Sequence, residues 1–311
     1  MALPPPSPNT RVVVTGGASG IGKEIARNLA QHGYDLVLVD IQQSVKETGE
    51  ELRAKGVESE EFLLDLTDRD ARQEFIDQVL ERPYDIVGLC NVAGLISAGR
   101  FEDLPLQRER VLVDVSVSAL HHLTGAFLPG MRARRAGAIL NVSSPVGILP
   151  LPYNASYSAA KSFSMFFSYA LHQELKKSGV SVTTLMPGPT KTNLLYGISE
   201  TRFMPDWAWR LPVFFDAAPT ARRGVNGMLR GSRMVAAGAY PWAAVALGRF
   251  VPLWLVLGPI RLAGQLGFPA REETTGRRIR AVADKVGTRI GGKRYAVVPE
   301  PAPVQVEAAT R

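Results

Sequence analysis

Tyr157 and Lys161 are the residues whose types and spacing most directly suggest chemistry. They lie four positions apart in a stretch with apolar residues at helical spacing, so a helix would place both side chains on one face. A free tyrosine has a pKa of about 10 and exchanges protons poorly at neutral pH. Because a nearby ammonium group favours the phenolate, we expect Lys161 to lower the pKa of Tyr157 and make it a general acid/base.

A glycine-rich segment near the N-terminus has the pattern of a phosphate-binding loop. Residues 15–22 read TGGASGIG, after a short β-branched run and before a stretch whose apolar residues recur at helical spacing. Glycines allow a tight turn there and let backbone N–H groups approach a pyrophosphate at the start of a helix. Because the strand and the helix flank the glycines in this order, the segment predicts a dinucleotide-binding loop.

Asp40 bears on the choice of dinucleotide. It ends the second β-branched run, where a carboxylate accepts hydrogen bonds from the adenosine ribose hydroxyls and repels a 2′-phosphate. Ser19 and Ile41 occupy the two positions where a cation for that phosphate would be expected. We therefore expect NAD(H) as the cofactor. NADP stays open, because Lys23 is close in sequence and could relieve the repulsion.

These groups need a scaffold that brings the ends of several strands together. From Arg11 to about Gly188, short β-branched runs alternate with longer helix-period stretches, which is typical of βαβ units around a buried parallel sheet. Right-handed crossovers then give an α/β fold with a doubly wound parallel sheet, a Rossmann fold, whose ligands bind beyond the carboxyl ends of the strands. The expected strands are Val12–Thr15, Leu36–Asp40, Glu61–Leu64, Ile86–Asn91, Ala138–Ser143 and Val180–Met186, and the first helix is expected at Ile21–His32.

The order and spacing of these motifs resemble the short-chain dehydrogenase/reductase family from residue 11 to about residue 193. The resemblance is carried by the glycine segment, Asp65, Asn91-Val92-Ala93-Gly94, Ser144, Tyr157-x-x-x-Lys161 and Pro187-Gly188. It implies that Tyr157 is the general acid/base, that Lys161 holds the nicotinamide ribose and tunes Tyr157, and that Ser144 polarises the substrate carbonyl. Ser144 is preferred to Ser143 because it lies thirteen positions before Tyr157, the separation usual in the family.

The resemblance also implies which residues contact the dinucleotide. Asp65 would meet the adenine, Asn91 and Gly94 would line the adenosine side, and residues 187–192 would contact the nicotinamide carboxamide. The expected cofactor-binding residues are Gly16, Ser19, Gly20, Ile21, Gly22, Asp40, Asp65, Leu66, Asn91, Ala93, Gly94, Tyr157, Lys161, Pro187, Gly188, Thr190 and Thr192. The implied chemistry is direct hydride transfer, with the protein supplying orientation and a proton.

Three residues depart from the family pattern. Ser116 stands where the proton relay usually has an asparagine, so we expect it to act as a catalytic residue through an additional water. Val92 replaces a second asparagine, and Pro145 after Ser144 is expected to reshape the carbonyl side of the pocket. Ser116 motivates an alternative function, that of a catalytically weak protein that binds the dinucleotide in a structural or sensing role.

The basic charge of the chain belongs to its C-terminal third. The formal net charge is +7, from 36 Lys+Arg and 29 Asp+Glu; residues 1–200 contain 19 and 22 of these, and residues 201–311 contain 17 and 7. No nucleic-acid module accompanies the basic segment, so no nucleic-acid partner is expected. The one cysteine, Cys90, excludes internal disulfides and cysteine-cluster metal sites and suits a reducing, cytoplasmic compartment. The four histidines lack metal-ligand spacing, and no metal is expected.

The expected organisation has four parts. Residues 1–10 form a disordered lead-in, residues 11–232 the catalytic domain with its substrate loop, residues 233–295 an apolar and then basic helical extension, and residues 296–311 a disordered tail. Within the extension, residues 234–268 have three alternatives: a peripheral membrane contact, a lid over the pocket, or a packing or homo-oligomer interface. The membrane alternative implies a lipophilic substrate, such as a fatty acyl, sterol or other lipid alcohol or ketone. The expected function is thus an NAD(H)-dependent oxidoreductase that acts on such a small molecule, and the expected assembly is a homo-oligomer.

Overall fold

The structure is a computed structural model that describes residues 3–192 and 215–238 and single residues beyond them. All of these lie in the first of two compact units, Met1–Glu272. The basic segment and the C-terminal tail expected from the sequence fall outside the described residues. The single residues are Pro241, Ala243, Gly248, Val251, Pro252, Trp254, Leu255, Leu257, Gly258, Arg261 and Leu262.

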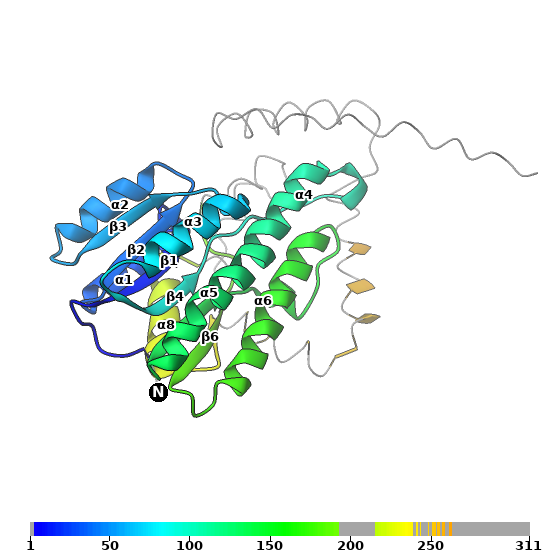
Figure 1. Cartoon of the computed structure of the whole chain (residues 1–311). Helices are drawn as coiled ribbons and strands as arrows, with labels where there is room; N and C mark the ends of the chain where they lie inside the picture. Colours follow the sequence, from blue (N-terminus) through cyan, green and yellow to red (C-terminus); the bar gives the residue numbers. More distant parts are fainter. Residues whose placement is uncertain are drawn as a thin grey trace, which may run out of the picture. The chain divides into compact units, whose positions relative to one another are not determined.

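Seven parallel strands form one sheet in the order β3-β2-β1-β4-β5-β6-β7 (Figure 1). The chain builds β1, β2 and β3 outward and then crosses to the other side of β1, so the strand order reverses between β1 and β4, where ligands bind in such folds. This confirms the doubly wound α/β fold, and the six predicted strands agree with the observed ones to within two residues at each end. The strands are β1 Thr10–Thr15, β2 Asp35–Asp40, β3 Ser59–Leu63, β4 Asp85–Asn91, β5 Gly137–Val142, β6 Val180–Pro187 and β7 Met234–Ala237.

Helices cover both faces of the sheet (Figure 1). Val12 and Val14 of β1 pack in one apolar cluster and Val13 in the other, because successive strand residues point to opposite faces. The first cluster receives side chains from α1 Gly20–Gln31, α2 Ser44–Arg53 and α8 Ala217–Arg230. The second receives them from α3 Arg69–Leu80, α5 Leu120–Ala133 and α6 Ala155–Glu174. The shorter elements are η1 Phe101–Asp103, α4 Leu106–Val113, the π-helical turn η2 Asp114–Ala119 and η3 Pro145–Gly147.

The seventh strand corrects the expected boundary of the extension. Met234–Ala237 pairs in parallel with the end of β6, whereas the sequence analysis assigned these residues to the apolar extension. The strand has only four residues and continues into an apolar run, so neither its length nor its periodicity distinguishes it. The sheet therefore extends to Ala237, and the apolar segment begins after it. Helical conformation is found there at several described residues, among them Pro241 and Trp254.

One helical stretch in the described part of the chain, Leu106–Ala133, is long and apolar enough to cross a membrane by length and composition alone. It comprises α4, the π turn and α5. Leu123, Phe127 and Met131 are buried in the cluster on one face of the sheet. Packing against the sheet therefore accounts for part of the apolar character of this stretch, whereas Leu106 and Val113 are exposed.

Candidate active site

Two glycines hold the loop between β1 and α1 close to the start of the helix. Gly16 has a φ of +74°, and its N–H donates to the Val39 carbonyl oxygen at 2.8 Å. A Cβ on Gly22 would lie 2.0 Å from the Gly16 carbonyl oxygen, so only glycine leaves room for this contact. The loop therefore lies against the N-terminus of α1, where free backbone N–H groups and the helix dipole favour a phosphate. These residues fit a dinucleotide pyrophosphate.

Asp40 faces the loop from the end of β2. Its Oδ2 accepts a hydrogen bond from the Ala18 N–H at 2.9 Å, and its Oδ1 accepts one from the Gln42 N–H at 2.9 Å. Burial raises the pKa of Asp40, and backbone hydrogen bonds, led by the one from Ala18, act in the opposite direction. A carboxylate has about four lone-pair positions, so Asp40 retains acceptors for ribose hydroxyls.

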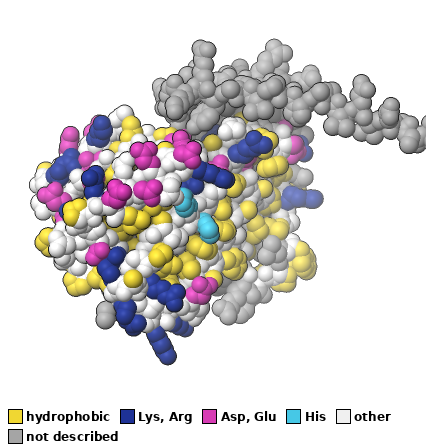
Figure 2. All heavy atoms as spheres, in the orientation of Figure 1, with side chains coloured by type: hydrophobic (Ala, Val, Ile, Leu, Met, Phe, Trp, Pro, Cys, Tyr) yellow, Lys and Arg dark blue, Asp and Glu magenta, His cyan; other side chains and the backbone are white. Residues whose placement is uncertain are grey.

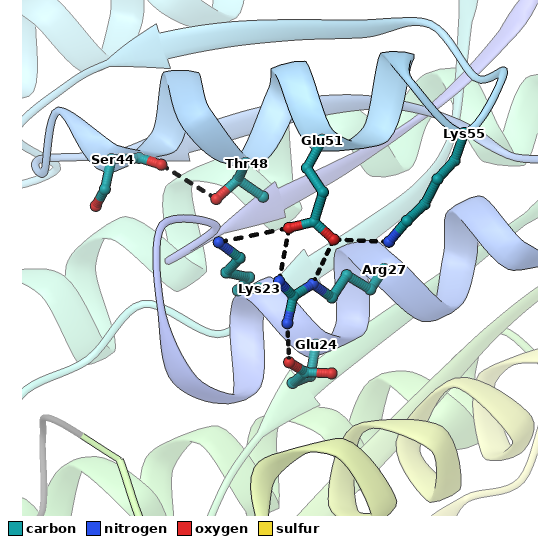
Figure 3. A network of polar contacts seen from close by, with 7 residues as sticks. All are labelled: Lys23, Glu24, Arg27, Ser44, Thr48, Glu51 and Lys55. Atoms are coloured by element: carbon teal, nitrogen blue, oxygen red, sulfur yellow. Dashed lines mark hydrogen bonds and ion pairs between the residues drawn. The ribbon is translucent and has the colours of Figure 1, made fainter.

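Lys23 is engaged by an ion-pair network between α1 and α2 (Figure 3). Its Nζ lies 3.6 Å from Glu51 Oε2, and the same carboxylate pairs with Arg27 at 2.6 Å and with Lys55 at 2.6 Å. The hydrogen bond from Arg27 is the main cause that lowers the pKa of Glu51 to about 2. Glu51 is therefore ionised at neutral pH and offsets the charge of Lys23.

The helix α6 carries Tyr157 and Lys161, and Ser144, the second residue after β5, lies beside Tyr157. A hydrogen bond joins Ser144 to Tyr157, and Lys161 Nζ lies 5.7 Å from the centre of the Tyr157 ring. The Ser143 hydroxyl instead donates to the Lys161 carbonyl oxygen at 2.7 Å and fastens α6 to the end of β5. The structure thus brings Ser144, Tyr157 and Lys161 together and gives Ser143 a different contact.

Burial shifts the pKa values of both titratable groups. It raises the pKa of Tyr157 to about 12 and lowers the pKa of Lys161 to about 8, because each charged form loses solvation. The hydrogen bond from Ser144 lowers the pKa of Tyr157 by a smaller amount. The expectation of a lowered tyrosine pKa is wrong in this structure, where Lys161 Nζ donates to the Val142 carbonyl oxygen at 2.9 Å. At neutral pH, Tyr157 keeps its proton.

Ser116 lies in the π-helical turn Asp114–Ala119. Its hydroxyl oxygen is buried and has no hydrogen-bond partner in the part of the chain that the structure describes. A Cβ on Gly94 would lie 3.6 Å from both Ser116 Oγ and Lys161 Nζ, so these two atoms face one point beside Gly94. Single π turns inside α-helices are frequent at functional sites.

Thr15 positions the segment after β4, a role that the sequence analysis missed. Its Oγ1 accepts hydrogen bonds from the N–H groups of Val92 at 3.0 Å and Ala93 at 3.1 Å. These bonds fix the segment against the glycine loop, where a Cβ on Gly16 would lie 3.0 Å from the Ala93 nitrogen. The sequence signal that could have indicated this role is a hydroxyl-bearing residue at the end of a buried strand.

Asn91 directs its side chain into the fold. The amide donates to Asn141 Oδ1 at 2.8 Å and to Thr124 Oγ1 at 3.3 Å, which connects β4 to β5 and α5. Both amide hydrogens are therefore used by the protein, and any contact of Asn91 with the adenosine would come from its other atoms.

Asp65 and Leu66 follow β3 at the carboxyl edge of the sheet. Asp65 Oδ1 accepts hydrogen bonds from the Thr67 N–H at 2.9 Å and the Thr67 hydroxyl at 2.8 Å. The carbonyl oxygen of Leu66 accepts a hydrogen bond from Arg72 of α3. The segment expected to meet the adenine is thus fixed by its own turn and by α3.

The segment after β6 approaches the glycine loop. Thr190 forms an isolated parallel bridge with Phe215, and the Thr190 hydroxyl donates to the Gly188 carbonyl oxygen at 2.9 Å. A Cβ on Gly20 would lie 3.0 Å from Thr192 Cγ2, so the two segments are in close proximity. Residues 193–214, which continue the expected substrate loop, lie outside the described residues.

Known proteins are similar to this chain over more than half of its length. The family model described as short chain dehydrogenase matches residues 10–202. The chain is 35% identical over 191 residues to the probable oxidoreductase EphD of Mycobacterium tuberculosis, which is 60% of this chain and 32% of that protein. It is 36% identical over 188 residues to the very-long-chain 3-oxoacyl-CoA reductase of Bos taurus, 58% of this chain and 60% of that protein. The match thus spans about a third of the length of EphD.

A solved structure gives a similar result. The short-chain dehydrogenase from Sphingobium yanoikuyae in complex with NADPH superposes with a TM-score of 0.67 at 28% sequence identity. The superposition covers 77% of this chain and 93% of that one.

Proposed function

Since the chain belongs to the short-chain dehydrogenase family, we propose that it is an NAD(H)-dependent oxidoreductase that interconverts a secondary alcohol and a ketone. The observation that carries the proposal is the hydrogen-bonded pair of Ser144 and Tyr157 beside Lys161. The glycine loop and Asp40, at the same edge of the sheet, supply the groups that a dinucleotide needs.

In this mechanism each residue of the cluster has a separate task. A bound dinucleotide supplies or accepts the hydride. Ser144 donates a hydrogen bond to the substrate carbonyl oxygen, and Tyr157, protonated at neutral pH, gives its proton to that oxygen during reduction. Lys161 holds the nicotinamide ribose. In the oxidation of an alcohol the same proton returns to Tyr157.

Ser116 belongs to the proton relay in this proposal. Its hydroxyl and Lys161 Nζ face the same point beside Gly94, and a water there would pass protons between Lys161 and solvent. The unpartnered hydroxyl also favours the second candidate, a dinucleotide-binding protein with little turnover, because a serine reaches less far than an asparagine. The second candidate predicts that the wild type binds NADH tightly but reduces no ketone. It also predicts that Ser116→Asn gains ketone reductase activity.

The preference for NAD(H) rests on Asp40 and on the pairing of Lys23 with Glu51. Asp40→Asn is expected to raise the affinity for NADP at least about fivefold relative to NAD, because a carboxylate and a 2′-phosphate about 4 Å apart repel by roughly 1–4 kcal/mol. Dissociation constants for NAD and NADP measured by calorimetry check this. Glu47→Gln, an exposed change of equal charge on α2, serves as the control. The same ratio of NADP affinity to NAD affinity in wild type and Asp40→Asn would contradict the role of Asp40 in selecting NAD(H).

The rate of ketone reduction is expected to fall as pH rises through about 8. Burial lowers the pKa of Lys161 to about 8, so the ammonium charge that holds the ribose is present below this pH and lost above it. Tyr157, whose pKa is about 12, stays protonated over the same range. A profile of kcat/KM from pH 6 to pH 10 tests the prediction. In Lys161→Arg the residual activity should not fall between pH 8 and pH 10, since guanidinium stays charged. An unchanged fall in this variant would mean that another group causes it.

The proposed function further includes a lipophilic substrate and a membrane contact through the segment after β7. Trp254, Leu255 and Leu262, in the segment after β7, are exposed, Trp254 to 72%. Such side chains suit insertion into a membrane interface. The name of the bovine relative, a very-long-chain 3-oxoacyl-CoA reductase, supports a lipid substrate class.

Liposome flotation tests the membrane contact. The full chain should float with vesicles of mixed zwitterionic and anionic lipids, and Trp254→Ser combined with Leu262→Ser should reduce the floating fraction severalfold. Leu80→Ser, which removes an exposed leucine from α3, should not. Substitutions are preferable to deleting residues 234–268, because that deletion removes β7. If the wild type does not float, the segment serves as a lid or an interface.

A further inference from the structure

Glu109 of α4 is a buried acidic residue that the mechanism above does not use. On the face of the molecule that Figure 2 shows, Asp and Glu side chains lie at the surface, several of them beside Lys or Arg. Glu109, in contrast, is only 3% exposed. Asp40 is the other buried acid among the described residues, and both of its carboxylate oxygens accept backbone hydrogen bonds.

Glu109 has little polar compensation for its burial. Its Oε2 accepts a hydrogen bond from the Ser97 hydroxyl at 3.2 Å, and its Oε1 is buried without a hydrogen-bond partner in the part of the chain that the structure describes. No cationic nitrogen of that part lies within 4.0 Å of either oxygen. A buried oxygen without a partner lowers the free energy of unfolding, so stability alone does not account for Glu109.

The side of the helix that carries Glu109 borders the proposed active site. Seven positions later in the same helical stretch, Ser116 Oγ faces Gly94, as Glu109 faces Ser97 three residues further along the segment after β4. Two turns of this helical stretch therefore run along that segment.

Ser97 fastens the segment after β4 to the start of α6. The carbonyl oxygen of Ser97 accepts a hydrogen bond from the side-chain amide of Asn154. The Gly99 N–H donates to the Tyr153 carbonyl oxygen at 2.9 Å. Two hydrogen bonds thus join the segment after β4 to the residues immediately before α6.

Asn154 is the N-cap of α6, but its side chain does not cap the helix. An N-cap asparagine usually accepts a hydrogen bond from a backbone N–H of the first turn. Here its amide nitrogen donates instead to the carbonyl oxygens of Ser97 and, at 3.3 Å, Tyr153. Tyr157 is the third residue of α6, so the position of its side chain depends on where this connection holds the first turn.

The residue before the N-cap is strained. Tyr153 has a φ of +69°, in the left-handed region that non-glycine residues rarely adopt. Such residues persist only where the surrounding structure holds them, and they cluster at functional sites. The strained Tyr153 and the buried Glu109 therefore place two energetic costs on one connection, which is typical of a contact that function maintains.

We propose that Glu109 is a positioning residue for ketone reduction. Through Ser97 and Asn154 it holds the first turn of α6, so that the Tyr157 hydroxyl meets the substrate oxygen. This role rests on the proposed function, because it requires Tyr157 as the proton donor. A misplacement of about 1 Å can lower a rate about a hundredfold, even when the changed residue lies away from the reacting atoms.

Two substitutions in the full chain break the connection at different points. Glu109→Leu removes the acceptor of the Ser97 hydroxyl, and Asn154→Asp replaces the amide donor by an oxygen while keeping a good N-cap residue. Each should lower kcat for ketone reduction about 10–100-fold. The dissociation constant for NADH should stay close to the wild-type value, because Lys161 remains bonded to the Val142 carbonyl oxygen of β5. The double variant should lose little more than either single one, since both break the same connection.

Control variants separate positioning from a structural role. Glu109→Gln keeps an acceptor for the Ser97 hydroxyl and should retain most of kcat. Glu102→Leu, an exposed change in η1, should leave kcat unchanged. Glu109→Leu should unfold within a few degrees of the wild type, because removal of the unpartnered oxygen offsets the lost hydrogen bond. Wild-type kcat in a folded Glu109→Leu protein, or parallel losses of kcat and thermal stability in Glu109→Leu and Glu109→Gln, overturns the proposal.

Hydrogen exchange distinguishes failure of this proposal from failure of the proposed function. A wild type that reduces no ketone contradicts the proposed function but leaves the contacts of Glu109 to be tested. The backbone N–H groups of residues 158–161, the first of which donates to the Asn154 carbonyl oxygen at 2.9 Å, should exchange faster in Glu109→Leu than in wild type or Glu109→Gln. Equal exchange in the three proteins overturns the role of Glu109 in holding α6, even if the wild type is active.

Discussion

Tyr157→Phe is expected to lower kcat for ketone reduction roughly 10²–10⁴-fold, the usual contribution of a general acid. Phenylalanine keeps the ring beside Lys161 and removes only the hydroxyl that is hydrogen-bonded to Ser144. The dissociation constant for NADH should therefore change little. Steady-state rates at 340 nm, with NADH affinity from its fluorescence, separate the two quantities.

Tyr169→Phe is the matched control for this substitution. Tyr169 lies on the same helix, and its hydroxyl contacts Met234 Sδ of β7 at 2.9 Å, away from Ser144. Its loss should leave kcat close to the wild-type value. A Tyr157→Phe protein with wild-type kcat would remove the proposed mechanism, and one that no longer binds NADH would give Tyr157 a structural role.

Gly22→Ala is expected to weaken dinucleotide binding roughly 10–100-fold, since overpacking costs about 1–3 kcal/mol where the surroundings cannot relax. The added Cβ would lie 2.0 Å from the Gly16 carbonyl oxygen, so the loop must move away from the N-terminus of α1. The N–H groups that hold the pyrophosphate would then be misplaced. Calorimetry with NAD measures the effect.

The control for Gly22→Ala is Gly125→Ala, in the middle of α5. A Cβ there would meet no atom within 4 Å, and alanine favours a helix, so NAD affinity should not change. Thermal unfolding of both variants shows whether the fold is retained. Wild-type affinity in a folded Gly22→Ala protein would mean that the loop does not hold the pyrophosphate.

The parts of the fold that depend on local sequence patterns could be predicted from the sequence. The buried strands beside β1 are apolar on both faces, and the position of Tyr157 and Lys161 on one face of α6 follows directly from the helix repeat. The strand β7 was not predictable, because its four residues continue into an apolar run. Its position depends on pairing with β6, which lies about 50 residues earlier in the chain.

The properties that depend on tertiary burial were also beyond the sequence. The direction of the tyrosine pKa shift follows from the burial of Tyr157 and from the contact of Lys161 with Val142, neither of which spacing reveals. The contact between Arg72 and His122 also depends on the tertiary fold. The two residues are 50 positions apart, and only the fold brings Arg72 Nε to 2.9 Å from His122 Nδ1.

Transfer of deuterium from NADH labelled at both C4 positions tests the central claim most directly. Wild-type protein is incubated with the labelled NADH and a panel of lipophilic ketones, and the alcohols are analysed by mass spectrometry. Direct hydride transfer with proton donation by Tyr157 predicts one deuterium on the carbinol carbon, at a rate that falls in Tyr157→Phe. Alcohol without deuterium, or no alcohol from any ketone although NADH is bound, would contradict the proposed function.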